Sequence, residues 1–386
     1  MDKTKAPAWA EVNLDNLKHN YRAIRSIVDE KAKVCCVVKA NACGSGSIMV
    51  AKTLEKENAD YFAVARFEEG LELRQNGITT PILVLSHTRE ENLEDAVKND
   101  ISLTVYTLDR AQKISESSKK IGKKGKIHIK VDSGMNRIGF KPVQKSVEDI
   151  VEISKLDNIY LEGIFTHFAC ADEIDKIHVE EQMTAYNYML SELEKKGVTF
   201  DLKHVSNSAA IIDSPELNFN MVRAGIILSG HYPSNEVKKE RIELRPVMKL
   251  KSIITNVKQI KKGDGISYGL TYKAQKDEII ATVAIGYADG YTRMQKNPKV
   301  LIKGKMYDVV GRICMDQMMV RLGENDSNIK IGDEVVLFGE GEATVERIAK
   351  DLGTINYEVL CMVNRRVDRV YFENNEVVGI TSNLLK

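Results

Sequence analysis

Five basic side chains stand at or just behind the ends of short apolar segments of the kind that form buried strands. They are Lys39, Lys130, Arg137, His167 and Arg223. Burying an ammonium group is costly, so a lysine at the end of a buried strand is unusual. One interpretation of Lys39 is a side chain that reaches water from the mouth of its strand. The other is a desolvated, neutral lysine that can form a Schiff base with an aldehyde.

Small polar residues near two further segment ends are suited to bind an anion. Asn207 and Ser208 open an expected helix, and Gly225 and Ile226 follow closely on Arg223. Backbone N–H groups at a helix start favour negative charge, and glycine permits a close approach. Taken singly, each of these residues also has a structural explanation. Their joint occurrence at strand ends predicts one site that binds a phosphate or a similar anion.

Three later segments, residues 265–269, 286–291 and 311–316, are marked by glycine or cysteine. They contain Tyr268, Tyr287 and Met315. On pattern alone these segments are turns, in which a tyrosine beside a glycine usually packs a corner. The pattern itself leaves open whether they take part in chemistry.

The apolar segments that position these side chains alternate with amphipathic stretches. The expected strands are residues 33–38, 61–65, 82–86, 102–105, 126–131, 161–166, 202–206 and 220–223. Expected helices between them include 68–76, with Gly77 as a C-terminal cap, and 174–196. Eight β–α alternations predict a parallel (β/α)8 barrel, in which functional residues gather at the C-terminal strand ends. A doubly wound open sheet is the alternative.

Beyond about residue 243 the segments become short and rich in β-branched residues. The expected strands are 248–256, 279–285, 299–303, 306–310, 318–322 and 334–338. Turns separate them without long helical spacers, which predicts a mainly antiparallel β domain. We expect two late helices, one capped by Thr344 and ending near Leu352 before Gly353. The expected domains are a barrel over 1–242 and a β domain over 243–386, with residues 1–13 pairing with the β domain.

Composition and charge narrow the class of protein. Hydrophobic residues make up 43% of the 386 residues, enough for a sizeable core, and the net charge is +1. This balance gives no electrostatic reason to expect nucleic acid or a membrane as a partner. No stretch approaches the roughly 20 apolar residues of a membrane helix, and residues 1–7 do not resemble a secretory signal. The 6 cysteines lack C-x-x-C spacing, so we expect no disulfide framework, no metal site and a cytoplasmic location.

Eight motifs, in order along nearly the whole chain, resemble those of the alanine racemase family. They are WAEVNL at 9–14, VVKANA at 37–42, VDSGM at 131–135, THF at 166–168, NSAA at 207–210, ISYG at 266–269, IGYADG at 285–290 and CMD at 314–316. One such motif is weak evidence, but eight in order are specific. The resemblance implies a barrel that binds pyridoxal 5'-phosphate (PLP), a C-terminal β domain and interconversion of L- and D-alanine. It also implies a head-to-tail homodimer, in which each site combines one subunit's barrel with the other's β domain.

The resemblance implies a role for each ionisable residue at the barrel mouth. Lys39 is similar to the lysine that holds PLP, and Arg223 to the arginine that hydrogen-bonds the pyridine nitrogen. A cation there disfavours the pyridinium form, which favours proton exchange over decarboxylation or transamination. Lys39 and Tyr268 resemble the two bases, which serve the D- and the L-enantiomer respectively from opposite faces. His167 resembles the residue that hydrogen-bonds Tyr268 and helps it to lose its proton.

Binding roles are implied for a second set of residues. The implied phosphate ligands are Ser208, the amides of Gly225 and Ile226, and Tyr357. Arg137 and the backbone at Met315 resemble the groups that bind the substrate carboxylate, and Tyr287 resembles a tyrosine at the substrate entry. Lys130 matches a lysine that is often carbamylated in this family. A carbamate there would hold Arg137 by a charge-assisted hydrogen bond.

The chain departs from the family pattern behind Lys39. Family members usually carry Ala-Tyr-Gly-His-Gly, whereas this chain has Cys43 and Ser45 in place of the tyrosine and histidine; Ser229 also replaces a common tyrosine. The usual tyrosine reaches the cofactor phosphate, and a cysteine is too short and too weak a donor to replace it. Losing one hydrogen bond to a charged group costs about 1.5–3 kcal/mol, so we predict weaker PLP binding than is typical.

Several other functions stay open on the sequence alone. One is a racemase for serine or another small amino acid, and another is a low-activity paralogue, which the changes at Cys43 and Ser45 keep open. A decarboxylase of basic amino acids is disfavoured by Arg223 and by the motifs around Tyr268 and Tyr287. A non-catalytic PLP carrier is disfavoured by the β domain. An alanine racemase would supply D-alanine for peptidoglycan or L-alanine from D-alanine.

Overall fold

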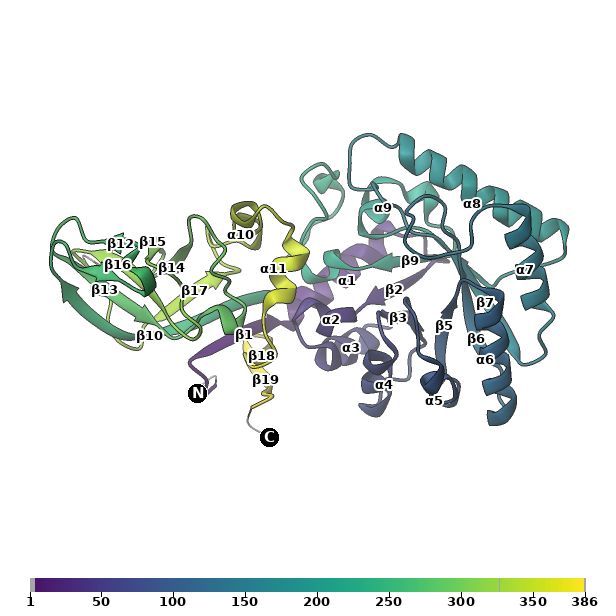
Figure 1. The fold of residues 1–386 in the computed structure, drawn as a ribbon, viewed down its shortest axis with the longest axis horizontal. Coiled ribbons are helices and arrows are strands. Elements are labelled where there is room, and N and C mark those ends of the chain that lie inside the picture. Colours follow the sequence, from purple (N-terminus) through teal and green to yellow (C-terminus); the bar gives the residue numbers. More distant parts are fainter. Residues whose placement is uncertain (1–3, 326, 385–386) are drawn as a thin grey trace. The chain divides into compact units, whose positions relative to one another are not determined.

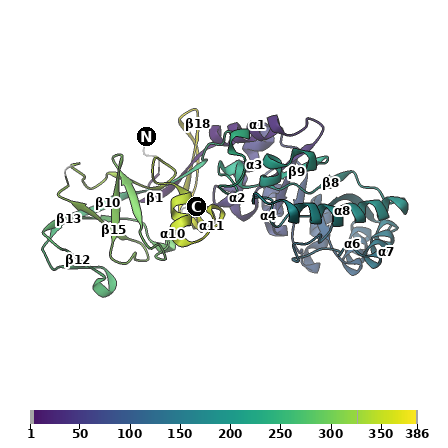
Figure 2. The ribbon, with the colours of Figure 1, turned by 90° about the horizontal axis from the view of Figure 1, so that it is seen from above.

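The structure, a computed structural model, describes residues 4–325 and 327–384 (Figure 1 and Figure 2). The chain divides into two compact units. The first consists of Met1–Asn16, Cys43–Gly46 and Pro246–Lys386, and the second of Leu17–Ala42 and Ser47–Arg245. Among the residues described, no helix is both long and apolar enough to cross a membrane.

The second unit is built on a parallel sheet of eight strands, as the sequence predicts. The strands are β2 (Lys33–Val37), β3 (Tyr61–Val64), β4 (Ile82–Val84), β5 (Ile101–Val105), β6 (Gly125–Lys130), β7 (Ile159–Phe165), β8 (Leu202–His204) and β9 (Met221–Ala224). Their order is β8-β7-β6-β5-β4-β3-β2-β9, so the last strand joins the first. Ser206, just beyond β8, accepts a hydrogen bond at its carbonyl oxygen from Arg223 N of β9 at 3.0 Å, and this bond draws the two sheet edges together. The prediction of a (β/α)8 barrel is confirmed, and the doubly wound alternative is wrong.

Helices follow the strands and cover the outside of this barrel (Figure 1). They are α1 (Leu14–Ile27), α2 (Lys39–Cys43), α3 (Ser47–Lys56), α4 (Phe67–Gln75), α5 (Leu93–Lys98), α6 (Leu108–Ile121), α7 (Gln144–Ser154), α8 (Ile177–Lys195) and α9 (Ser208–Asp213). Local sequence sets their ends. The α6 helix begins behind Thr107, whose side chain accepts from Arg110 N, and stops at Gly122 with a φ of 70°. The α4 and α8 helices match the predicted helices 68–76 and 174–196.

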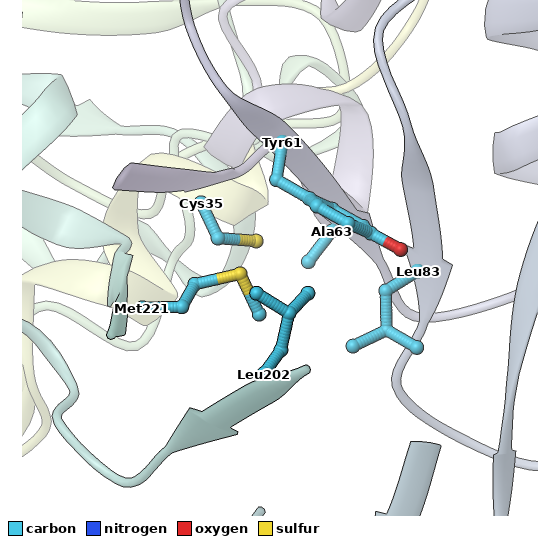
Figure 3. Close-up of a cluster of buried hydrophobic side chains, with 6 residues drawn as sticks. All are labelled: Cys35, Tyr61, Ala63, Leu83, Leu202 and Met221. Atoms are coloured by element: carbon cyan, nitrogen blue, oxygen red, sulfur yellow. The ribbon is translucent and has the colours of Figure 1, made fainter. Parts of the chain in front are cut away.

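Apolar side chains fill the part of the barrel near the strand starts (Figure 3). This cluster consists of Cys35, Tyr61, Ala63, Leu83, Leu202 and Met221. Burial raises the pKa of the Cys35 thiol to about 12, so the thiol stays protonated and packs as an apolar group. These side chains pack against one another inside the barrel, where the polar ring of His128 is also buried.

The first unit is a mainly antiparallel sheet, which confirms the predicted fold class. Its strands are β1 (Ala8–Asn13), β10 (Met248–Ile260), β13 (Glu278–Val283), β14 (Lys299–Ile302), β15 (Lys305–Val310), β16 (Met318–Gly323), β17 (Glu334–Phe338), β18 (Asp368–Glu373) and β19 (Glu376–Thr381). The order β13-β16-β15-β14-β17-β10, with β10 also paired to β13, closes a ring of strands. β1 extends the sheet, antiparallel to β10 and parallel to β18. The sequence analysis did not predict β18 and β19.

Two helices and a small hairpin complete the first unit. The α10 helix (Val345–Leu352) begins and ends as predicted, because the Thr344 side chain accepts from Arg347 N and Gly353 has a φ of 72°. The second helix is α11 (Asn356–Met362). The hairpin pairs β11 (Gly265–Ile266) with β12 (Tyr272–Lys273), and its turn carries Tyr268.

Candidate active site

Lys39 lies just beyond β2, at the start of a left-handed turn. The turn residues Ala40, Asn41, Ala42 and Cys43 have φ values of 52°, 56°, 52° and 51°. Left-handed helical backbone costs roughly 1–2 kcal/mol for each L-residue, so neighbouring groups must hold the turn. Lys39 itself is exposed. In the single chain Lys39 reaches solvent, as in the first of the two interpretations, because β2 ends at Val37 and the turn carries the lysine out of the strand.

Glu69 of α4 holds the start of this turn. One of its carboxylate oxygens accepts a hydrogen bond from Ala40 N at 2.7 Å. The other accepts from Ala65 N at 2.8 Å and from Arg66 N at 3.1 Å. Bonds to an ionised acceptor are stronger than bonds between neutral groups. A carboxylate from the neighbouring β–α unit thus fixes the backbone behind Lys39, a role that the predicted helix 68–76 did not reveal.

Arg223 is buried, and acceptors surround both of its terminal nitrogens. Nη1 donates to His204 Nδ1 at 2.9 Å and to His204 O at 3.0 Å. Nη2 donates to Thr166 O at 2.8 Å, Val205 O at 2.9 Å and His167 Nδ1 at 3.0 Å. Burial lowers the pKa of Arg223 to about 10, so the side chain remains a cation at neutral pH. Within the described parts of the chain, only its Nε donor lacks an acceptor.

His167 is held beside Arg223 as a neutral ring. Burial, followed by the positive charges of Arg223 and Arg137, holds the pKa of His167 well below its ordinary range. A guanidinium only donates, so His167 Nδ1 must accept the bond from Arg223. The single proton of the ring is therefore on Nε2. His167 presents a hydrogen-bond donor at that atom and does not act as a base there.

Lys130 is buried close to two other cations. Its Nζ donates to Val131 O at 2.6 Å and lies 5.5 Å from the centroid of the Phe165 ring. Burial, followed by the charges of Arg223 and Arg137, lowers the pKa of Lys130 to about 7. Arg137 is exposed, and the structure gives it no hydrogen bond or ion pair with another described residue. Lys130 is thus a partly neutral amine at neutral pH, close to a guanidinium that is free to bind an anion.

The expected phosphate ligands of the barrel come together at the start of α9. Ser208 Oγ accepts a hydrogen bond from Gly225 N at 3.0 Å, which links α9 to the turn Ile226–Ser229. A side chain added at Gly225 would contact Ser208 Oγ at 3.5 Å and nothing else within 4 Å beyond its chain neighbours. The space above this backbone is therefore open to a ligand. Asn207 has a structural role, because its Oδ1 accepts from Ala210 N and caps α9.

In the first unit, the three segments marked by glycine or cysteine lie together. Ser267 Oγ donates to Arg312 O at 2.6 Å and lies 3.4 Å from Cys314 Sγ, which brings the Tyr268 turn to the segment 311–316. Tyr287 N donates to Cys314 O at 3.1 Å. A Cβ on Gly286 would lie 2.3 Å from Cys314 O, so only glycine permits this close approach.

Arg366 fixes two of these segments relative to each other. It donates to Asp289 at 2.7 Å and to Asp316 at 2.6 Å. Met315 lies next to Asp316, and Ala288 N donates to Met315 O at 3.0 Å. Arg366 was not among the residues predicted from the sequence, since it lies far from both motifs along the chain.

The side chains of interest in the first unit are open to solvent in the single chain. Tyr268 is 69% exposed, Met315 53% and Tyr287 39%. A hollow of about 700 Å³ beside Tyr268 is lined by residues of the hairpin, β10 and β13. Tyr357 lies partly buried in α11 of the same unit. This unit alone thus presents a tyrosine hydroxyl without the enclosure that an active site normally provides.

Comparisons with known proteins match both units of the chain. Residues 12–233 match the family described as the N-terminal domain of alanine racemase, and residues 247–371 match its C-terminal domain. The chain belongs to the alanine racemase family. The alanine racemase of Methanococcus maripaludis is 50% identical, over 95% of this chain and 98% of its own. That of Clostridium novyi is 46% identical, over 98% and 99%.

Solved structures of alanine racemases resemble the whole fold. The alanine racemase of Clostridium difficile 630 is 61% identical, with a TM-score of 0.97 over 99% of this chain and 100% of its own. The alanine racemase of Bacillus anthracis, solved with bound L-Ala-P, is 36% identical, with a TM-score of 0.92 over 99% of each chain. The resemblance stated from the motifs is therefore confirmed at the level of the family.

Proposed function

We propose that this alanine racemase homologue is a PLP-dependent racemase that interconverts L- and D-alanine. The observation that carries the proposal is Arg223. Its terminal nitrogens are saturated, and its one remaining donor, Nε, is suited to an acceptor such as a pyridine nitrogen. A buried cation at that position disfavours a protonated pyridine and so favours simple proton exchange.

The barrel residues fit PLP in chemistry and number. Lys39 offers an exposed amine for the aldehyde. The Ser208 hydroxyl and the backbone at Gly225 and Ile226 border a space open to the phosphate, although Gly225 N donates to Ser208 Oγ in this structure. Tyr357 and Asn207 are further candidate ligands. When bound, PLP would withdraw electrons from the α-carbon of the amino acid and make its proton removable.

Two groups on opposite faces of the substrate move that proton. Lys39 Nζ serves the D-enantiomer, and Tyr268 Oη serves the L-enantiomer. His167 Nε2–H stabilises the deprotonated oxygen of Tyr268 by donating to it. Arg137 and the Met315 backbone hold the substrate carboxylate, with Tyr287 at the entry. These groups orient the Cα–H bond between the two bases.

A shared site in a head-to-tail homodimer fits the exposure of the first unit. Tyr268 is 69% exposed in its own chain, whereas a base that retains its proton between turnovers needs an enclosed site. In the proposed dimer, the barrel of one subunit receives Tyr268 of the other. None of the described cysteines takes part in a disulfide, which supports a location in the reducing cytoplasm.

Chiral analysis of the purified, PLP-loaded protein tests the reaction. The protein is incubated separately with L-alanine, L-serine and L-lysine, and the enantiomers are separated over time. We expect rapid loss of optical purity in alanine. Turnover of serine or lysine without alanine would keep the chemistry and reject the substrate. Optical purity in all three, with the cofactor bound, would reject the function and favour a low-activity paralogue.

Matched variants test the two bases. Lys39→Ala and Tyr268→Phe should each remove most racemisation. Lys33→Ala, at the other end of β2, and Tyr188→Phe, an exposed tyrosine of α8, serve as controls and should retain it. Full activity of Tyr268→Phe in both directions would reject the two-base assignment.

A further inference from the structure

Glu162 enters the barrel from the end opposite the active-site residues, because of a bulge in β7. The register pairs Ile127 with Leu161 but His128 with Gly163, so Glu162 is the extra residue. A bulge interrupts the alternation of side chains and can redirect one of them to the other face. Glu162 therefore points into the barrel. Its carboxylate also lines a pocket of about 330 Å³ at the strand starts, together with Lys33 and Asn220.

A chain of hydrogen bonds leads from Glu162 through the barrel to Arg223. Glu162 Oε2 lies 3.0 Å from His128 Nε2. His128 Nδ1 lies 2.9 Å from His204 Nε2, and His204 Nδ1 lies 2.9 Å from Arg223 Nη1. A Cβ on Gly163 would lie 2.4 Å from His128 Nδ1, so glycine at this position makes room for the ring. Both histidine side chains are fully buried.

The groups at the two ends of this series of hydrogen bonds decide which atom donates in each of them. Arg223 only donates, so His204 Nδ1 accepts and the proton of the neutral ring is on Nε2. Burial and the nearby charge of Arg223 hold the pKa of His204 well below its ordinary range, which keeps the ring neutral. His204 Nε2–H must then donate to His128 Nδ1. His128 in turn donates from Nε2 to Glu162.

Glu162 is the carboxylate at the end of this series of hydrogen bonds, and Arg223 has no carboxylate among its own partners. The hydrogen-bond partners of Arg223 are carbonyl oxygens and histidine nitrogens, and the structure describes no carboxylate in contact with it. Burial alone would raise the pKa of Glu162. The hydrogen bond from His128 and the charge that His128 carries when protonated, followed by the hydrogen bonds from Ser102 and Tyr61, outweigh this effect and lower it to about 2, so Glu162 is ionised.

We propose that Glu162 is a positioning residue for racemisation, which acts through His128 and His204 to hold Arg223 and His167 in a single hydrogen-bonding arrangement. The proposal rests on the proposed function for its effect on rate, although the hydrogen-bond chain itself does not. Arg223 also donates to His167 Nδ1, so the proton of the His167 ring is on Nε2, the atom that we propose donates to Tyr268. Replacing the carboxylate by a neutral acceptor weakens the hydrogen bond from His128 Nε2. The two histidines then hold Arg223 and His167, the groups that act on the cofactor and on Tyr268, less firmly.

The experiment compares Glu162→Gln with Tyr61→Phe. The first variant keeps the size of the side chain and removes its charge. The second, the matched control, removes another hydrogen bond to the same carboxylate oxygen, which Tyr61 makes at 2.9 Å, and leaves the chain intact. Proteins labelled with ¹⁵N-histidine report the tautomer of each of the 7 histidines by NMR. His128→Gln and His204→Gln assign the two signals, and steady-state kinetics give kcat and KM for alanine.

We expect His128 and His204 of the unsubstituted holoenzyme to be neutral, with the proton on Nε2. Glu162→Gln should shift the ¹⁵N signal of His128 Nε2 and lower kcat by about tenfold, the effect of one charge-assisted hydrogen bond, with little change in KM. Tyr61→Phe should leave the histidine ¹⁵N signals in place and kcat within about twofold of that of the unsubstituted protein. An unchanged His128 signal or an unchanged kcat in Glu162→Gln would overturn the proposal, as would equal effects of the two variants. If neither the unsubstituted protein nor any variant racemises alanine, the proposed function is wrong. The histidine signals still show whether the hydrogen bonds from Glu162 to Arg223 are formed.

Discussion

Lys130 is the residue whose protonation the structure relates most directly to substrate binding. We predict that CO₂ adds to its Nζ and that the resulting carbamate anchors Arg137. CO₂ adds to a neutral amine only. Burial and the charges of Arg223 and Arg137 lower the pKa of Lys130 from 10.5 to about 7. At pH 7 this raises the neutral fraction from about 0.03% to about one half, roughly three orders of magnitude.

The sign of the pH dependence follows from that pKa. Lys130 gains its proton as the pH falls through about 7, so the carbamate should be lost on the acid side. Arg137 is exposed, which reduces the value of the new ion pair. We therefore expect the loss of the carbamate to raise KM for alanine by about tenfold, with a smaller effect on kcat.

The assay uses protein in buffer freed of CO₂, with bicarbonate added back in steps at pH 6, 7 and 8. KM should fall as the bicarbonate concentration rises, and the concentration needed for a given fall in KM should be highest at pH 6. With ¹³C-bicarbonate, one additional carbon resonance should appear in the unsubstituted protein and be missing from Lys130→Ala. Small carboxylic acids should restore part of the activity of Lys130→Ala. A KM that is independent of bicarbonate, together with no incorporated ¹³C, would refute this reasoning.

Three further substitutions test other parts of the site. Cys43→Tyr should bind PLP more tightly by about tenfold or more, measured by titrating apo-protein, and equal or weaker binding would contradict the prediction. Glu69→Gln should lower the free energy of unfolding in urea by about 1–3 kcal/mol and loosen the turn behind Lys39, whereas its exposed neighbour Glu68→Gln should not. Gly163→Ala places a Cβ 2.4 Å from His128 Nδ1 and should cost about 1–3 kcal/mol in stability, so a wild-type thermal melt would show that the ring has room to move.

The sequence by itself determined the barrel elements, most strands of the first unit and the family. Each of the eight barrel strands lies within a few residues of an apolar run, because a strand buried on both faces needs a continuous apolar segment. The limits of α10 followed from Thr344 and Gly353, since capping depends on residues next to one another in the chain. The same local logic placed Lys39, His167 and Arg223 at strand ends.

Longer-range features of the first unit were less accessible. β18 pairs in parallel with β1, more than 350 residues earlier in the chain. No local pattern specifies such a partner, because strand pairing depends on which edges meet after folding. Likewise, Arg366 joins Asp289 and Asp316 only because three distant turns converge.

Tertiary structure alone decided how the site residues are held. Four successive left-handed residues follow Lys39, although alanine and cysteine have no preference for that conformation, and only the Glu69 carboxylate from another β–α unit explains the start of the turn. The exposure of Lys39 was likewise set by where β2 ends. The chain from Arg223 to Glu162 depends on a bulge in β7 and on distances of about 3 Å between side chains from different strands. Sequence places residues on elements, but hydrogen-bond direction and protonation follow from the contacts between elements.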